Sequence, residues 1–104
     1  MQKIDILLFN QFSNHCLANT IEPLRAANTL ARKDHYQWRY LTMEGGKAES
    51  SSGLVVFPHD EISNGEGDLL IVMPSYGVRA LDTSKTTKAL KSAARRYKNI
   101  LGFD

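Results

Sequence analysis

The sequence has little of several features that would classify a protein at once. It holds one cysteine, Cys16, in 104 residues, so no internal disulfide can form and a reducing compartment is the expected setting. Neither sign of charge dominates, because 13 basic and 11 acidic residues leave a formal net charge of +2. This balance predicts neither nucleic acid nor an anionic membrane as a partner. No apolar run approaches the length of a membrane span, and Asp5 interrupts the first run, unlike a signal peptide. We therefore expect a soluble, cytoplasmic chain with no membrane partner.

The common cofactor motifs are also missing. No Gly-x-Gly-x-x-Gly follows the first apolar run and no Gly-x-x-x-x-Gly-Lys-Ser/Thr occurs anywhere, so the phosphate cradles of nucleotide sites are absent. His15, His35 and His59 are dispersed, without a spacing such as His-x-x-x-His, and are interpreted as surface or turn residues. We expect neither a cofactor nor a metal.

What the sequence does contain is a set of short apolar segments. Residues 4–9, 69–73 and 100–103 are nearly continuous apolar runs, typical of strands covered on both faces of a parallel sheet. Alternation over 36–42 predicts a further strand, and residues 54–57, after a Ser/Gly-rich cluster, predict an excursion of short strands.

Two segments have helical spacing. The first is predicted over 17–32, and Pro23 within it means that the helix either begins near Thr20 as N-cap or carries a kink. The second is predicted over 84–98, with Asp82, Thr83 or Ser84 as its cap. Strands alternating with helices predict an α/β fold with a mainly parallel sheet.

The last apolar run has the composition of an interior strand, yet a single residue follows it. We expect residues 1–104 to be the first part of a larger domain, because a helix should follow and cover such a strand. The alternative is a complete miniature α/β domain, which would bury little surface.

Polar residues follow three of the predicted strands. Asn10 follows the first strand, Ser75 and Tyr76 follow the strand at 69–73, and Asp104 follows the last one. Ligands of open parallel sheets bind at the carboxyl ends of the strands, so these four residues are predicted to bind a small polar molecule. For Asn10 and Ser75 the alternative is ordinary loop capping.

Three other features have a functional and a structural interpretation. Cys16, at the start of the first helical segment, is either a reactive thiol or a small buried hydrophobe, and we favour the latter. Glu22 either points into the crevice at the strand ends or complements the helix dipole in a first turn. A basic run without acids predicts the solvated face of a helix rather than a DNA contact; it comprises Lys85, Lys88, Lys91, Arg95, Arg96 and Lys98.

Several strings together resemble a known family. They are Ile-Asp-Ile-Leu-Leu-Phe at 4–9, Ile-Glu-Pro-Leu-Arg-Ala-Ala-Asn at 21–28, Ser-Ser-Gly-Leu at 51–54, Asp-Leu-Leu-Ile-Val at 68–72 and Asn-Ile-Leu-Gly-Phe-Asp at 99–104. The chain resembles the amino-terminal half of the class I glutamine-amidotransferase-like (PfpI/ThiJ-type) domain of GlxA-group AraC-type transcription regulators.

The resemblance implies a flavodoxin-like three-layer sandwich about twice this length, followed by a carboxy-terminal helix-turn-helix region that binds DNA and is not in this chain. In enzymes of the superfamily the position of Asp104 carries a cysteine nucleophile, and a glutamate that contacts it aligns near Cys16. Both departures favour a non-catalytic domain that senses a small polar metabolite and forms a homodimer. The alternatives are a PfpI/ThiJ-like hydrolase or glyoxalase-like enzyme using Asp104 or Cys16, and a dimerisation module with an empty cleft.

Overall fold

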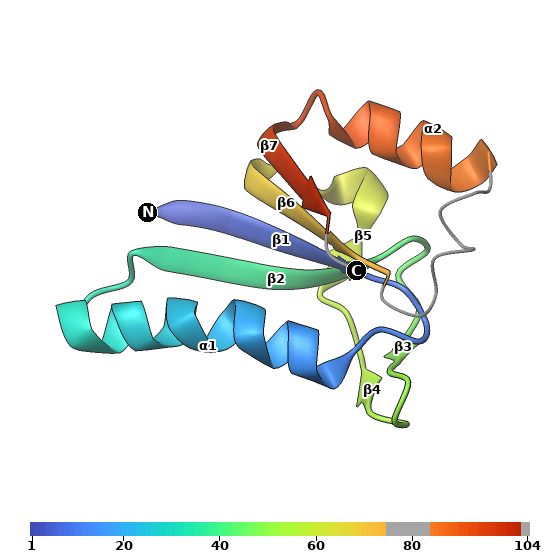
Figure 1. Cartoon of the computed structure of the whole chain (residues 1–104). Helices are drawn as coiled ribbons and strands as arrows, with labels where there is room; N and C mark the ends of the chain where they lie inside the picture. The colour runs from blue at the N-terminus through green and yellow to red at the C-terminus, as the bar shows by residue number, and fades with distance from the viewer. Residues whose placement is uncertain (75–83, 103–104) are drawn as a thin grey trace.

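The core of the chain is a five-stranded sheet in the order β5-β2-β1-β6-β7, in which every pair is parallel. The computed structural model describes residues 1–74 and 84–102. The strands are β1 (Gln2–Leu8), β2 (Tyr36–Thr42), β5 (Asp60–Glu61), β6 (Gly67–Met73) and β7 (Tyr97–Gly102). One long helix lies on one side of the sheet and a shorter helix on the other (Figure 1). The predicted α/β three-layer architecture with a parallel sheet is confirmed.

The central strand β1 separates two cores. Alternate residues of β1 point to opposite faces, as the pleat of a strand requires. The core on the side of the long helix contains Ile4, Ile6, Leu8, Phe12, Leu17, Ala48, Ile71 and Met73. The core on the other side contains Leu7, Phe9, Leu41, Ile62, Leu70, Val72, Ala93 and Tyr97.

The long helix α1 runs from Asn14 to Ala31, and its N-cap is Ser13, whose Oγ accepts from the Cys16 amide at 3.2 Å. The predicted cap at Thr20 is wrong: Thr20 lies inside α1 and its hydroxyl donates to the Cys16 carbonyl. The helix continues through Pro23. Because Pro23 and Asn19, four residues earlier, are both exposed, water can replace the backbone bond that proline cannot donate.

The helix α2 runs from Ser84 to Ala93 and ends earlier than the prediction of residue 98. Two of the caps proposed for it, Asp82 and Thr83, lie outside the described residues. The helix ends before Tyr97 because Tyr97 pairs with Gly67 as the first residue of β7. The predicted excursion is confirmed as an antiparallel pair, β3 (Ala48–Glu49) with β4 (Val55–Val56), and a short 3-10 helix η1 (Ile62–Asn64) precedes β6.

The strand β7 lies at the edge of the sheet and pairs with β6. Its Ile100 and Leu101 side chains are 39% and 49% exposed. Within the described residues these two positions of β7 are therefore not covered, unlike the apolar residues of β1 and β6. Among the helices of residues 1–74 and 84–102, none has the length and apolar character needed to span a membrane.

Candidate functional site

The carboxyl ends of β1, β6 and β7 lie at the same edge of the sheet, because these strands are consecutive in the sheet order and parallel. This is the arrangement on which the predicted ligand site depends. Ser75, Tyr76 and Asp104 lie outside the described residues, so the site remains a prediction for these three residues.

Asn10, the described member of the predicted site, joins the loop after β1 to β3. Its Oδ1 accepts from the Glu49 amide at 3.0 Å. The neighbouring Gln11 adopts a left-handed backbone conformation with φ of 74° and donates its amide to the Glu49 carbonyl at 2.7 Å. With Oδ1 used in this way, the NH2 of Asn10 is the group that can donate to a ligand.

Asn10 lines a cavity of about 230 Å³ at the ends of β1 and β2. Apolar and polar groups line it in similar measure; the lining residues are Leu8, Phe9, Asn10, Thr42, Met43, Glu44, Gly46, Lys47 and Ala48. The segment between β2 and β3 is held by Thr42, whose Oγ1 donates to the Gly46 carbonyl at 2.7 Å. Polar groups of this kind can orient a small polar molecule, and the apolar groups can contact its apolar part.

Cys16 is half-buried and packs against the apolar core on the α1 side, which agrees with its interpretation as a small hydrophobe. Glu22 lies in the middle of α1 rather than in its first turn, so the dipole explanation is wrong. Its carboxylate accepts from Arg25 Nε at 2.6 Å, and the side chain is 62% exposed. Glu22 is therefore a surface ion-pair residue of the helix.

The histidines behave as surface or turn residues. His15 and His35 are exposed, and His59 accepts from the Tyr40 amide through Nδ1 at 3.0 Å while stacking on the Tyr40 ring. Within the described part of the chain, no group of three or more His, Cys, Asp or Glu residues is placed to hold a metal ion.

Half of the basic run is engaged within the chain itself. Lys85 pairs with Glu44, and Lys98 pairs with Asp68 at 3.0 Å. Arg96 makes three hydrogen bonds, to the carbonyls of Gly65 and Ile62 and to Ser92 Oγ. The run therefore serves in part to hold α2 and β7 against the rest of the fold.

A second polar cluster, which the sequence analysis missed, lies toward the amino ends of the strands, on the face of the sheet covered by α2. Asp5 is 2% exposed and receives Arg39 in a bidentate pair, with Nε–Oδ1 at 2.9 Å and Nη2–Oδ2 at 3.0 Å. Tyr97 Oη donates to Asp5 Oδ2 at 2.5 Å. The two residues of the ion pair face each other in the β1–β2 register, which is why they meet.

Burial of the Asp5 carboxylate is acceptable only because its oxygens are fully paired, since an unpaired buried charge is strongly destabilising. The hydrogen bond to Asp5 raises the pKa of Arg39 above its ordinary value, although partial burial opposes it. Burial, and then the bond to the Asp5 carboxylate, raise the pKa of Tyr97 well above its ordinary value. One signal was available in the sequence: an acid within a continuous apolar run.

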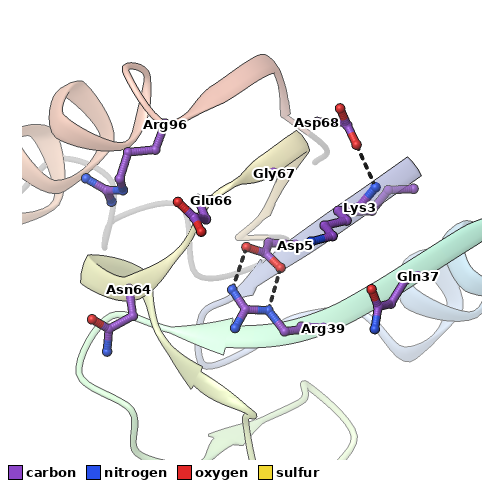
Figure 2. A pocket seen from close by; sticks show the side chains of 10 residues that line it. Lys3, Asp5, Gln37, Arg39, Asn64, Glu66, Gly67, Asp68 and Arg96 are labelled. Carbon is purple, nitrogen blue, oxygen red and sulfur yellow. Dashed lines mark hydrogen bonds and ion pairs between the residues drawn. The ribbon is translucent and has the colours of Figure 1, made fainter. Parts of the chain in front are cut away.

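This cluster borders a larger cavity of about 460 Å³ between the starts of β1, β2 and β6 (Figure 2). Three acidic and three basic residues line it: Asp5, Glu66 and Asp68, and Lys3, Arg39 and Arg96. Figure 2 shows Arg39 directed at Asp5 across the strands. The balance of charge gives no preference for an anionic or a cationic ligand. The cavity lies at the amino ends of the strands, remote from the carboxyl edge at which the ligand site is predicted.

The fold places the chain in a class. Its structure matches a DJ-1 superfamily protein from Agrobacterium tumefaciens with a TM-score of 0.69 and 19% identity, over 98% of this chain and 53% of the other. An AraC family transcriptional regulator from Pseudomonas putida matches with a TM-score of 0.79 and 26% identity, over 98% of this chain and 64% of the other. The chain thus has the flavodoxin-like fold of DJ-1/ThiJ/PfpI proteins.

Its curated relatives are transcription regulators. The HTH-type transcriptional regulator GbdR of Pseudomonas aeruginosa is 31% identical over 100 residues, which are 95% of this chain and 27% of the relative. The HTH-type transcriptional regulator GlxA of Rhizobium meliloti is 37% identical over 97 residues, 91% of this chain and 30% of the relative. No protein-family model matches. The chain therefore spans less than a third of these relatives, and the resemblance to a ThiJ-like part of GlxA-type regulators is confirmed.

Proposed function

We propose that this chain is the ligand-sensing part of an AraC-type transcription regulator. In the intact protein it binds a small polar metabolite at the carboxyl ends of β1, β6 and β7, forms a homodimer, and passes occupancy to a DNA-binding module carried elsewhere. The observation that carries the proposal is the match of 91–95% of the chain to two HTH-type regulators. The setting of such a regulator is the cytoplasm.

The chemistry of the edge supports a small ligand. The cavity of about 230 Å³ lies at the ends of β1 and β2, and of the described residues in the predicted site only Asn10 lines it. Its volume is below the range of about 300–1,000 Å³ typical of drug-sized ligands. Asn10 supplies amide donors, and the predicted contributions of Ser75, Tyr76 and Asp104 are hydroxyl and carboxylate groups. Such groups orient a polar metabolite, while the apolar wall formed by Leu8 and Phe9 supplies part of its affinity.

A sensor need not react with its ligand. By the family resemblance, Asp104 stands where the enzymes carry their cysteine, and a carboxylate there lacks the nucleophilicity of a thiolate. What a sensor requires is a ligand that binds one arrangement of the dimer better than another. We therefore assign the strand-end residues a binding role and no catalytic one.

A thermal-shift screen of the intact protein against amino acids, betaines and carnitine-like compounds tests the proposal. A true ligand at about 100 times its dissociation constant adds about 2.7 kcal/mol of stability, which raises the Tm by several degrees. Asn10→Asp keeps the acceptor for the Glu49 amide but loses the NH2, so the shift should disappear. Asn19→Asp, on the exposed surface of α1, is the matched control and should retain it.

Three results would contradict the proposal. The first is the absence of stabilisation by any compound while regulation of the target promoter stays intact. The second is turnover of methylglyoxal or an amide substrate that Asp104→Ala abolishes, which would establish the hydrolase or glyoxalase-like alternative. Tolerance of bulky residues at positions 75 and 76 without loss of response would instead indicate a dimerisation module.

A further inference from the structure

The side chain of Tyr97 reaches across a neighbouring strand. Tyr97 begins β7 and pairs with Gly67 of β6, and β6 lies between β7 and β1 in the sheet. Its hydroxyl nevertheless lies 2.5 Å from Oδ2 of Asp5, a β1 residue. One side chain thus links the edge strand to the centre of the sheet.

Gly65 leaves room for this side chain, and Gly67 allows β6 to approach β1 closely. A Cβ on Gly65 would collide with Tyr97 Oη and would lie 2.9 Å from Leu41 Cδ1. A Cβ on Gly67 would lie 2.9 Å from the Lys3 carbonyl oxygen, and its φ of +157° also disfavours other residues. Any other residue at position 65 would therefore require Tyr97 to move away from Asp5.

Arg96, the residue before Tyr97, also holds this end of β7. Its Nε donates to the Gly65 carbonyl at 2.6 Å and its Nη2 to the Ile62 carbonyl at 2.9 Å. Beyond Tyr97, by contrast, the residues of β7 are exposed and the strand pairs with β6 along one edge. The start of β7 is thus anchored by side chains, while the rest depends on the β6 ladder.

We propose that Tyr97 is a positioning residue. Its hydroxyl donates a hydrogen bond to Asp5, which is paired with Arg39, and this bond fixes the start of β7 and thereby the place of its carboxyl end beside β6. The importance of that end rests on the proposed function, because the predicted ligand residue Asp104 follows it. The anchor itself is a property of the described residues and requires no ligand.

Hydrogen exchange of the intact protein, followed by mass spectrometry, tests the anchor. Tyr97→Phe removes the hydroxyl but leaves Asp5 paired with Arg39, and Gly65→Ala displaces the hydroxyl without removing it. Tyr36→Phe is the control for the first, since the Tyr36 hydroxyl makes no hydrogen bond with the described part of the chain. Gly46→Ala is the control for the second, because a Cβ there meets nothing within 4 Å.

Both test variants should exchange the amides of residues 97–102 faster by about tenfold or more, the loss expected for a hydrogen bond to a charged group. In Tyr97→Phe the amides of 36–42 should keep their rates, whereas Gly65→Ala can also disturb them through Leu41. Both controls should match the wild type. Unchanged rates in 97–102, or equal acceleration in both strands of Tyr97→Phe, would overturn the proposal; if Gly65→Ala does not fold, Tyr97→Phe decides. Because no ligand is present, a failed ligand screen would leave this result intact.

Discussion

The two faces of the central sheet are held together in different ways. On the face covered by α1, the residues that β1 contributes are all apolar. Ile4, Ile6 and Leu8 pack there in one core with the helix. The face toward α2 combines Leu7 and Phe9 with the buried carboxylate of Asp5. Apolar packing therefore stabilises the α1 face, whereas hydrogen bonds and an ion pair also stabilise the α2 face. Substitutions on the two faces should lower stability for these different reasons.

The largest expected effect is on the α1 face. Ile6 is fully buried there, and Ile6→Ala should lower the free energy of unfolding by about 2–5 kcal/mol, because the lost transfer energy adds to the cost of a cavity. Denaturant unfolding measures it. Ile6→Val should cost about 0.5–1.5 kcal/mol, and an equal loss for both variants would show that volume does not control this face.

A smaller effect is expected on the α2 face from Asp5→Asn. This change keeps the shape but removes the charge that accepts from Arg39 and Tyr97, which should cost about 1–3 kcal/mol. The loss is moderated because the Arg39 side chain is 35% exposed and can turn to water. The decisive measurement is a double-mutant cycle with Tyr97→Phe, in which purely additive losses would contradict a shared network.

The smallest effect depends on pH and belongs to Tyr97. Its pKa is raised in the folded chain by burial and by the Asp5 carboxylate, from an ordinary value of 10.0. Stability from this shift is fully present below that ordinary value and declines as pH rises above it, because the unfolded chain releases the proton first. The slope difference between wild type and Tyr97→Phe should approach about 1.4 kcal/mol per pH unit.

Urea unfolding between pH 8 and pH 11 can follow this difference. Parallel curves for wild type and Tyr97→Phe above pH 10 would show that the Tyr97 hydroxyl is not buried against Asp5, and would remove the physical basis of the anchor.

Apolar pattern predicted the elements of the sheet well. The strand over 36–42 has the predicted bounds, and the order of strands and helices gave the parallel α/β class. These features were accessible because backbone pairing and burial follow from the spacing of apolar residues along the chain. Element ends were less accessible: Ser13 rather than Thr20 caps α1, and Tyr97 belongs to β7 rather than α2.

One of the two candidate sites was predicted from the sequence in part, and the other was not. Asn10 was predicted from its place after a strand, and the structure adds that its Oδ1 is bonded to Glu49 while it lines a cavity. The Asp5–Arg39–Tyr97 cluster was not predicted, because its members are separated by 34 and 92 positions in the chain. Nothing in local spacing indicates that three such distant residues share hydrogen bonds.

The sequence alone determined the class of fold and the resemblance to a family, because both depend on local patterns and short strings. Tertiary structure alone decided which strand lies at the edge of the sheet, which residue caps α1, and which charged side chains pair with one another. Those outcomes depend on side chains that meet only after the strands have been ordered in the sheet. The physical reason is that the apolar character of each residue already indicates whether it will be buried. A hydrogen bond between distant residues, by contrast, forms only when the fold brings both partners together.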